Sequence, residues 1–144
     1  MPFIATWPGI IKAGTSSNFN GCFWDLFPTF QQVAGLQPSA GIDGISILPA
    51  LKQHQQQQHD YLYWEFQEEG GKQAVRWGKW KGIKLKVSLL DHPVMELYNL
   101  EADNSEQHNI AAQHPDVVEK IDRIMRMAHQ SNKDWPLLKS EMPH

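Results

Sequence analysis

Two consecutive glycines, Gly70 and Gly71, constrain the fold of this chain more than any other feature. Aromatic and aliphatic residues flank them on both sides, in the stretches Tyr61–Phe66 and Gln73–Lys81. Glycine takes the positive φ of a tight reversal without a steric penalty, so this pattern predicts a β-hairpin.

The hairpin is expected to continue into a larger sheet and to meet a helix. A second reversal at Gly78-Lys79 would return the chain along Trp80–Lys86, and Val94–Leu100 alternates apolar and polar residues like a half-buried strand. His114-Pro115-Asp116 then has the chemistry of a helix start. The sequence therefore predicts an α+β fold, a small antiparallel sheet of about four strands packed against a C-terminal helix. Apolar residues at helical spacing would form the buried side of that helix: Val117, Ile121, Ile124, Met125 and Ala128.

The first third of the chain has weaker signals. We expect a short strand at Phe3–Trp7, stopped by Pro8-Gly9, and a helix at Asp25–Val33 that ends at Ala34-Gly35. Leu26, Phe30 and Val33 would share one side of that helix. The run of glutamines between Gln53 and His59 resembles a metal or aggregation tract, but a solvated loop is the simpler interpretation. These elements suggest two parts, residues 1–52 and residues 53–144.

Composition excludes several classes of protein. The chain has 144 residues, 41% of them hydrophobic, with six Trp and six Phe to fill a core. Its net charge is −3 and its basic residues are dispersed, so we expect no nucleic-acid partner. No apolar run approaches the ~20 residues that cross a bilayer, so no membrane segment is expected, and Met1-Pro2 begins no signal pattern. Cys22 is the single cysteine, and we expect it to be a buried small apolar residue.

Several motifs follow one another along the chain: Tyr63–Phe66, Gly70-Gly71, Gln73–Arg76, Gly78–Lys81, Glu96–Leu100, Asp103, Glu106 and Asn109. Upstream of them lie the segments Pro2–Gly9 and Asp43–Ser46. In this order the motifs resemble the C-terminal portion of a sulfatase of the arylsulfatase type, in the alkaline-phosphatase-like superfamily, and the resemblance extends from Pro2 to about Val118.

The resemblance implies that catalytic groups are absent from this chain. The family's nucleophile is a formylglycine made from a cysteine or serine two residues before Pro or Ala and four before Arg. Cys22 has Trp24 and Leu26 at these positions, so it does not fit. Calcium and formylglycine are expected in a missing N-terminal catalytic domain, which would be this chain's partner. Residues 1–52 would be a remnant of the central α/β domain, whose strand and helix belong to the large sheet. A bacterial parent enzyme would be periplasmic or secreted.

The candidate substrate-binding residues surround the predicted hairpin turn. The carboxylate of Glu65 could have a raised pKa or bind a sugar hydroxyl, or it could pair across the sheet with Arg76 or Lys81. Relatives tend to place a histidine where this chain has Gln67, whose amide can form hydrogen bonds but cannot act as a general acid. Lys72 and Gln73 offer a cation and an amide to a sulfated sugar. Arg76 could bind an anion or clamp a neighbouring group.

Three further features favour structural interpretations. His92 is taken as a loop histidine. Asp103, Glu106 and Asn109 could suggest a calcium site, but helix capping and structural hydrogen bonds explain them better. Trp135 follows turn residues and is expected to fold back onto the body of the protein.

Two functions follow from these expectations. The first is the C-terminal subdomain of a sulfuric ester hydrolase, which supplies structural support and substrate contacts and is not catalytically competent alone. The alternative is a free-standing module that binds sulfated carbohydrate or self-associates. Because the strand Phe3–Trp7 would have unpaired backbone groups, it could form a homodimer by strand pairing or be covered by the chain's own tail.

Overall fold

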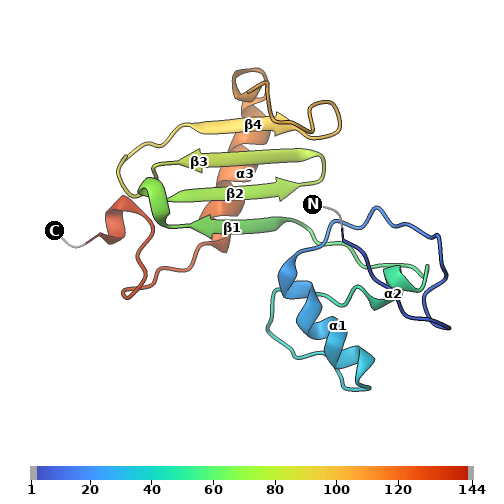
Figure 1. Ribbon diagram of the computed structural model, residues 1–144. Coiled ribbons are helices and arrows are strands. Elements are labelled where there is room, and N and C mark those ends of the chain that lie inside the picture. Colours follow the sequence, from blue (N-terminus) through green and yellow to red (C-terminus); the bar gives the residue numbers. More distant parts are fainter. Residues whose placement is uncertain (1–2, 143–144) are drawn as a thin grey trace. The chain divides into compact units, whose positions relative to one another are not determined.

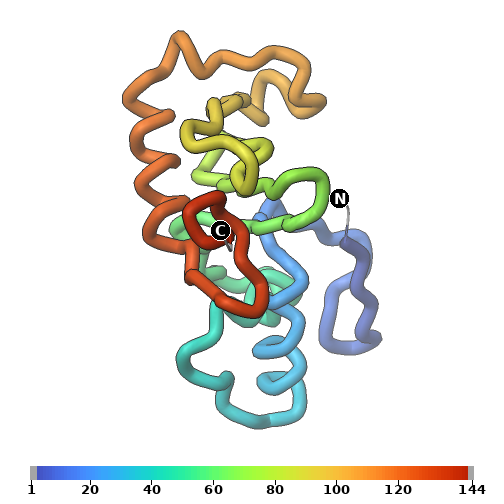
Figure 2. Tube along the Cα trace, turned by 90° about the vertical axis from the view of Figure 1, so that its left-hand side faces the viewer, coloured from blue at the N-terminus to red at the C-terminus, as the bar shows by residue number. Residues whose placement is uncertain are grey.

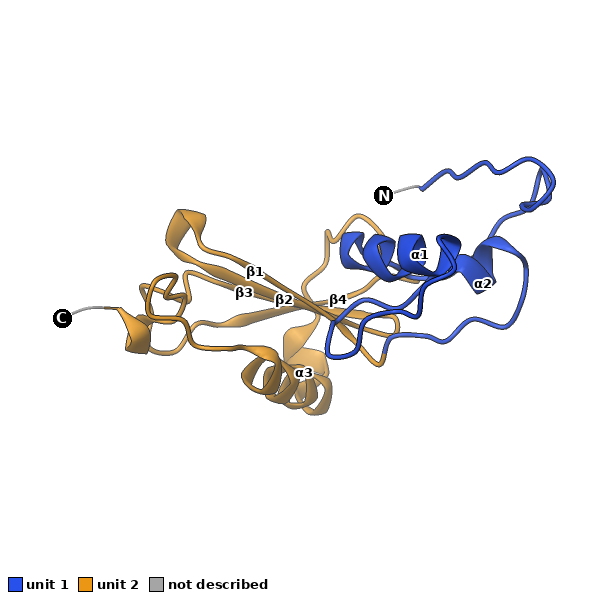
Figure 3. Ribbon diagram, turned by 90° about the horizontal axis from the view of Figure 1, so that it is seen from below, with its two compact units in different colours: residues 1–59 blue, residues 60–144 orange. Residues whose placement is uncertain are grey.

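The computed structural model describes residues 3–142, so Met1 and Pro2 lie outside the described residues. The chain divides into two compact units, unit 1 (residues 1–59) and unit 2 (residues 60–144), coloured separately in Figure 3. Unit 1 contains a 3-10 turn at Phe23–Asp25 and the helices α1 (Leu26–Val33) and α2 (Leu48–Leu51). Unit 2 contains the strands β1 (Leu62–Phe66), β2 (Lys72–Trp77), β3 (Trp80–Leu85) and β4 (Met95–Asn99), helix α3 (Pro115–Ala128), and 3-10 turns at Glu68–Gly70, Ala111–Gln113 and Lys139–Glu141.

The four strands of unit 2 form one antiparallel sheet in the order β1-β2-β3-β4, as Figure 1 shows. Both predicted reversals are present. Gly70 and Gly71 have φ values of 88° and 77°, and Gly78 has a φ of 57°. These angles lie in the left-handed region that glycine adopts without strain, which explains why the turns occur at these positions.

Helix α3 covers one face of the sheet, which Figure 3 shows from its edge. The helix begins at Pro115 and buries most of its predicted apolar side, although Ala128 is only half-buried. Gly82 in β3 permits a close approach, because a Cβ atom there would lie 2.6 Å from Cγ2 of Ile121. The α+β prediction is therefore confirmed. The core between the sheet and the helix consists of Val75, Met95, Leu97, Val117, Ile121, Ile124 and Met125.

Unit 1 differs from the prediction at its beginning. Residues 3–7 form no strand, and the carbonyl of Trp7 accepts hydrogen bonds from the amides of Ile10 (3.0 Å) and Ile11 (2.9 Å) in a turn. A strand requires a neighbour for its backbone groups, and no strand is described elsewhere in unit 1. The edge strand on which a strand-paired homodimer was predicted is therefore not formed.

Helix α1 lies within the predicted range and ends as expected, with Gly35 at a φ of 76°. However, its apolar side is not a core, because Phe30 and Val33 remain 62% and 42% exposed. The buried residues of the helix are Pro28 and Thr29 instead. Cys22 is half-buried rather than buried.

The carboxylate of Asp25 organises unit 1, although no local pattern in the sequence predicts this role. The buried side chain of Asp25 accepts hydrogen bonds from the amides of Cys22 (2.7 Å) and Ile45 (2.9 Å), and Nε2 of His59 lies 2.9 Å from its Oδ1. The segment 53–59 is a loop as predicted, but its last residue is held by this contact.

Candidate functional site

Three segments of unit 2 meet at one end of the sheet, which we call the loop end. They are residues 66–72 between β1 and β2, residues 86–94 between β3 and β4, and the tail, residues 135–142 (Figures 1 and 2). Backbone hydrogen bonds join them. The amide of Val87 donates to the carbonyl of Gly71 (3.1 Å), and the amide of Lys139 donates to the carbonyl of Val87 (2.9 Å).

The predicted binding residues do not form a single site. Glu65, Gln67, Lys72 and Gln73 lie at or near the loop end, whereas Arg76 lies at the opposite end of the sheet with its Nε 3.5 Å from the carbonyl of Gly78. Glu65 and Gln73 are paired in register, and their contacts place them on the face that carries α3. Because strand residues alternate between faces, Lys72 points to the other face.

The expected pairing of Glu65 with Arg76 or Lys81 is wrong. Glu65 instead accepts a hydrogen bond from the hydroxyl of Tyr63, and Nδ1 of His129 lies 2.6 Å from its Oε1. Gln73 joins the same network by donating from Nε2 to the Tyr63 hydroxyl (2.7 Å). Lys81 is bound elsewhere, with its Nζ 2.6 Å from Oε1 of Glu106.

His129 connects the sheet to the tail. Its Nε2 lies 2.8 Å from Oε1 of Glu141, while its Nδ1 faces Glu65, so the ring lies between two carboxylates. Sequence reasoning missed both His129 and Glu141. Local spacing does not reveal these contacts, because Glu65 lies 64 residues before His129 and Glu141 lies 12 residues after it. The one local signal is a polar residue directly after the apolar side of α3.

The electrostatics of this network favour a fixed ion pair. Burial lowers the pKa of His129, but hydrogen bonds to Glu141 and Glu65 outweigh burial, and the net pKa is raised above 6.5. Burial raises the pKa of Glu141, but His129 and the amides of Leu138 and Leu137 outweigh it and lower the pKa to about 2. Burial and the Glu65 contact raise the pKa of Tyr63, so its phenol keeps its proton. The network can hold two segments together, but every ring nitrogen in it is already engaged.

The tail is anchored by a different residue from the one predicted. Trp135 does not fold back, since its side chain is 67% exposed, whereas Leu137 is only 1% exposed. The carbonyl of Trp135 accepts a hydrogen bond from Nε2 of Gln67 (3.1 Å). Oε2 of Glu141 accepts from the amides of Leu137 and Leu138, both at 3.0 Å.

The turn itself presents one accessible cation. Nζ of Lys72 forms an ion pair with the exposed carboxylate of Glu69 and lies 5.2 Å from the centre of the Phe66 ring. Solvent screens an exposed ion pair of this kind, so the ammonium group can exchange partners at little cost.

The residues suggested for calcium are occupied by the protein. Oδ2 of Asp103 accepts a hydrogen bond from the amide of His108 (2.8 Å), Glu106 binds Lys81, and Oδ1 of Asn109 accepts from the amides of Leu97 and Ala111. These bonds organise a loop, so the structural interpretation holds but the expected helix cap is wrong. His92 lies in a loop, as predicted.

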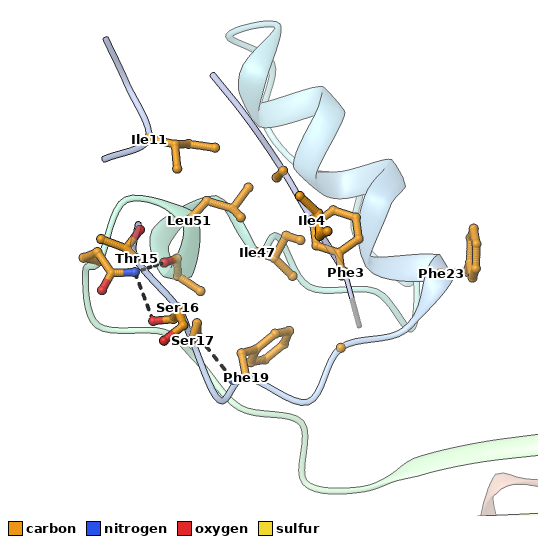
Figure 4. Close-up of a pocket in the computed structure, with 14 residues that line it drawn as sticks. Phe3, Ile4, Ile11, Thr15, Ser16, Ser17, Phe19, Phe23, Ile47 and Leu51 are labelled. Atoms are coloured by element: carbon orange, nitrogen blue, oxygen red, sulfur yellow. Dashed lines mark hydrogen bonds between the residues drawn. The ribbon is translucent and has the colours of Figure 1, made fainter. Parts of the chain in front are cut away.

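Each unit also contains a pocket. In unit 1, a pocket of about 620 Å³ is lined mainly by apolar side chains, several of which Figure 4 labels, including Phe3, Phe19 and Ile47. In unit 2, a pocket of about 280 Å³ lies at the loop end, bordered by Gln73 and His129. Within residues 3–142, no helix is long and apolar enough to cross a membrane.

Comparison with known proteins identifies the family. Residues 1–133 match the family described as N-sulphoglucosamine sulphohydrolase, C-terminal. Arylsulfatase K of Danio rerio is 31% identical over 135 residues, covering 88% of this chain and 25% of the relative. N-acetylglucosamine-6-O-sulfatase of Bacteroides thetaiotaomicron is 27% identical over 141 residues, covering 94% of this chain and 25% of the relative. A crystal structure of a candidate sulfatase from Bacteroides thetaiotaomicron superposes with a TM-score of 0.63 at 25% identity, covering 72% of this chain and 23% of that one.

The comparisons also show how much of each relative this chain covers. This chain spans about a quarter of the length of these relatives, which come from both an animal and a bacterium. The region that matches the family contains unit 1, the sheet and α3. The chain therefore belongs to the sulfatases, as a member of the family formed by the C-terminal region of N-sulphoglucosamine sulphohydrolase.

Proposed function

We propose that this chain is the C-terminal subdomain of a sulfuric ester hydrolase and supports a catalytic domain that lies outside this sequence. The family match over residues 1–133 carries the proposal, together with the quarter of the relatives' length that the chain spans. On this proposal the chain is not catalytically competent alone. The sequence supports this view, because Cys22 is followed by Trp24 and Leu26 where the formylglycine motif requires Pro or Ala and then Arg.

We further propose that unit 1 packs against the catalytic domain. Its large apolar side chains, among them Ile4, Phe23 and Phe30, are mostly exposed, and its pocket is lined by similar residues. Exposed large apolar side chains in such number are unusual on a free surface, and they favour an interaction site. The partner that we propose for this surface is the catalytic domain of the same enzyme, because the chain spans only about a quarter of the length of its relatives. Self-association is the competing outcome, and it would appear as a dimer of the isolated chain in light scattering.

The substrate contact that we propose is the turn from Gln67 to Gln73. The curated relatives include enzymes named for sulfated amino sugars, N-acetylglucosamine-6-O-sulfatase and N-acetylgalactosamine-6-sulfatase. A sulfate ester is an anion that a free ammonium and backbone N–H groups recognise. Lys72 supplies the ammonium group, and its ion pair with Glu69 is weak enough to be replaced.

Turnover tests the catalytic part of the proposal. The purified chain should not hydrolyse an aryl sulfate, with or without added calcium. Hydrolysis that co-purifies with the chain through successive columns would contradict the proposal.

Binding tests the substrate contact. Titration with glucosamine 6-sulfate should shift the amide NMR signals of Gly70, Gly71 and Lys72, and Lys72→Gln should weaken the effect. Lys79→Gln is the matched control, because Lys79 lies at the other end of the sheet with its Nζ 5.0 Å from the Trp80 ring centre, much as Lys72 lies over Phe66. Equal losses in the two variants would show that the turn has no specific role.

A further inference from the structure

The pocket at the loop end of unit 2 has the composition of an anion site. It encloses about 280 Å³ and is bordered by the sheet, by the last turn of α3, by the β3–β4 loop and by the tail. Three cationic side chains line it: Lys84, Arg126 and Lys139. We propose that this pocket binds a small oxyanion, namely sulfate, phosphate or the sulfate group of a sugar ester.

Most of the carboxylates that pair with the basic side chains of the pocket do not line it themselves. Lys84 and Arg126 share a single carboxylate, that of Asp122, while Lys139 pairs with Asp91 at 2.7 Å. Of these two carboxylates, only that of Asp91 lines the pocket. His129 also lines the pocket, and its two nitrogens face Glu65 and Glu141, which do not line it. The four basic groups are thus matched by four carboxylates, but the basic groups are the ones that border the pocket.

Two of the cations that line the pocket, Arg126 and Lys139, are exposed and can change partners. Lys139 and Asp91 are both exposed, and so is Arg126, so these pairs contribute little to folding. An oxyanion between Arg126 and Lys139 would gain charge-assisted hydrogen bonds without leaving either cation unpaired. Lys84 is held more firmly beneath α3, where it and Asp122 are mostly covered.

The tail builds the outer wall of the pocket. Leu138, Lys139 and Ser140 line it, and the tail is fixed by the bond from the Lys139 amide to Val87 and by the contact between Glu141 and His129. The family match ends at residue 133, before this wall begins. Most of the lining residues lie within the matched region. The pocket lies on the α3 side of the sheet, away from the side chain of Lys72.

An NMR titration of the whole chain tests the proposal. Sodium sulfate, compared with sodium chloride at equal ionic strength, should shift the amide signals of Gln73, Val87 and Ser140. Arg126→Gln and Lys139→Gln should each weaken binding by about tenfold, the factor that corresponds to one charge-assisted hydrogen bond.

Arg123→Gln is the matched control. Arg123 lies on the same helix and is paired with Glu119 four residues before it, just as Arg126 is paired with Asp122, but it does not line the pocket. This variant should bind sulfate like the original chain. Thermal unfolding of each variant shows whether it remains folded.

Two results would overturn the inference: no sulfate-specific shift at the pocket amides, or an equal loss of binding in Arg123→Gln and Arg126→Gln. Titrations with sodium phosphate and with glucosamine 6-sulfate identify the source of the anion. If the sugar binds more tightly than inorganic sulfate, the pocket takes a sulfate ester. If the two bind equally well, the pocket takes the free ion. The sugar probe rests on the proposed function, whereas inorganic sulfate does not. Shifts confined to Gly70–Lys72 would support the proposed function and reject this pocket.

Discussion

Unit 2 is held together by an apolar core, whereas unit 1 is organised around the carboxylate of Asp25. In unit 2 the side chains of Val75, Leu97 and Ile121 are fully buried between the sheet and α3. In unit 1 few hydrophobic residues are buried, and most of its large apolar side chains face solvent. Burial of apolar surface is the dominant stabilising contribution to a fold, so the two units should differ in stability.

The difference also shows how each unit relates to a larger protein. Unit 2 has its own core and has the features of an independently folding domain. Unit 1 consists of loops and short helices whose hydrogen bonds converge on one buried acid, and its apolar surface remains available to a partner.

The largest predicted effect tests the core of unit 2. Ile121→Ala should lower the free energy of unfolding by about 2–5 kcal/mol, because it removes buried methylene groups and leaves a cavity. Urea denaturation followed by tryptophan fluorescence measures the change. Met127→Ala on the exposed side of the same helix should cost less than about 0.5 kcal/mol. If Ile47→Ala in unit 1 proved as costly as Ile121→Ala, the contrast between the units would be lost.

The contact between β3 and α3 gives the next effect. Gly82→Ala should destabilise the chain by about 1–3 kcal/mol, because the new methyl group would lie 2.6 Å from Ile121. A double-mutant cycle sharpens the test. In the Ile121→Ala background the cost of Gly82→Ala should fall, since the cavity accepts the methyl group. Purely additive losses would show that Gly82 matters for another reason.

A smaller effect is expected at the centre of unit 1. Asp25→Ala should leave the amides of Cys22 and Ile45 without their partner and weaken the local structure by roughly 1–2 kcal/mol. Hydrogen exchange should therefore accelerate in unit 1 and remain unchanged in the strands of unit 2. Asp43→Ala, which removes an exposed carboxylate two residues before Ile45, serves as the control. Faster exchange in β2 and β3 as well would mean that the units do not respond separately.

The smallest effect concerns pH and the tail. The pKa of His129 is raised above 6.5, so its contribution is complete below pH 6.5 and is lost as the pH rises through the raised value. The pKa of Glu141 is lowered from 4.5 to about 2, so its contribution is complete above pH 4.5 and is lost as the pH falls towards 2. The tail should therefore be most firmly docked between about pH 4.5 and 6.5, by ~1 kcal/mol or less relative to alkaline pH.

Protection factors for the amides of Leu137 and Leu138 measure this dependence. His129→Gln should abolish the loss on the alkaline side, and the exposed His108→Gln should not. Unchanged protection from pH 5 to pH 9 in the original chain would contradict the role given to His129.

The sequence predicted the parts of the fold that depend on local chemistry. Gly70, Gly71 and Gly78 dictate their turns through their own backbone freedom, and the spacing in α3 identifies Ile121 and Met125 as buried. The short strand at residues 3–7 failed because an apolar run specifies a strand only when a neighbouring strand is present.

The candidate site was less predictable, because its contacts join residues far apart in the chain. Glu65 and Gln73 were identified from their places in the hairpin, but their partner His129 lies beyond α3 and cannot be found from local spacing. The same limit explains why the sequence predicts Trp135 as the anchor of the tail, whereas Leu137 is the residue that is buried in the structure. Both are apolar residues beside a proline, and only the packing distinguishes them.

The order of the strands in unit 2 has a consequence for how the chain acquires its fold. Each strand pairs with the strand next to it in the sequence, so every pairing closes only a short loop. Such local connectivity lowers the entropic cost of the first contacts and favours rapid folding. The sheet should thus assemble hairpin by hairpin as a nascent chain emerges from the ribosome, with helix docking as the later step.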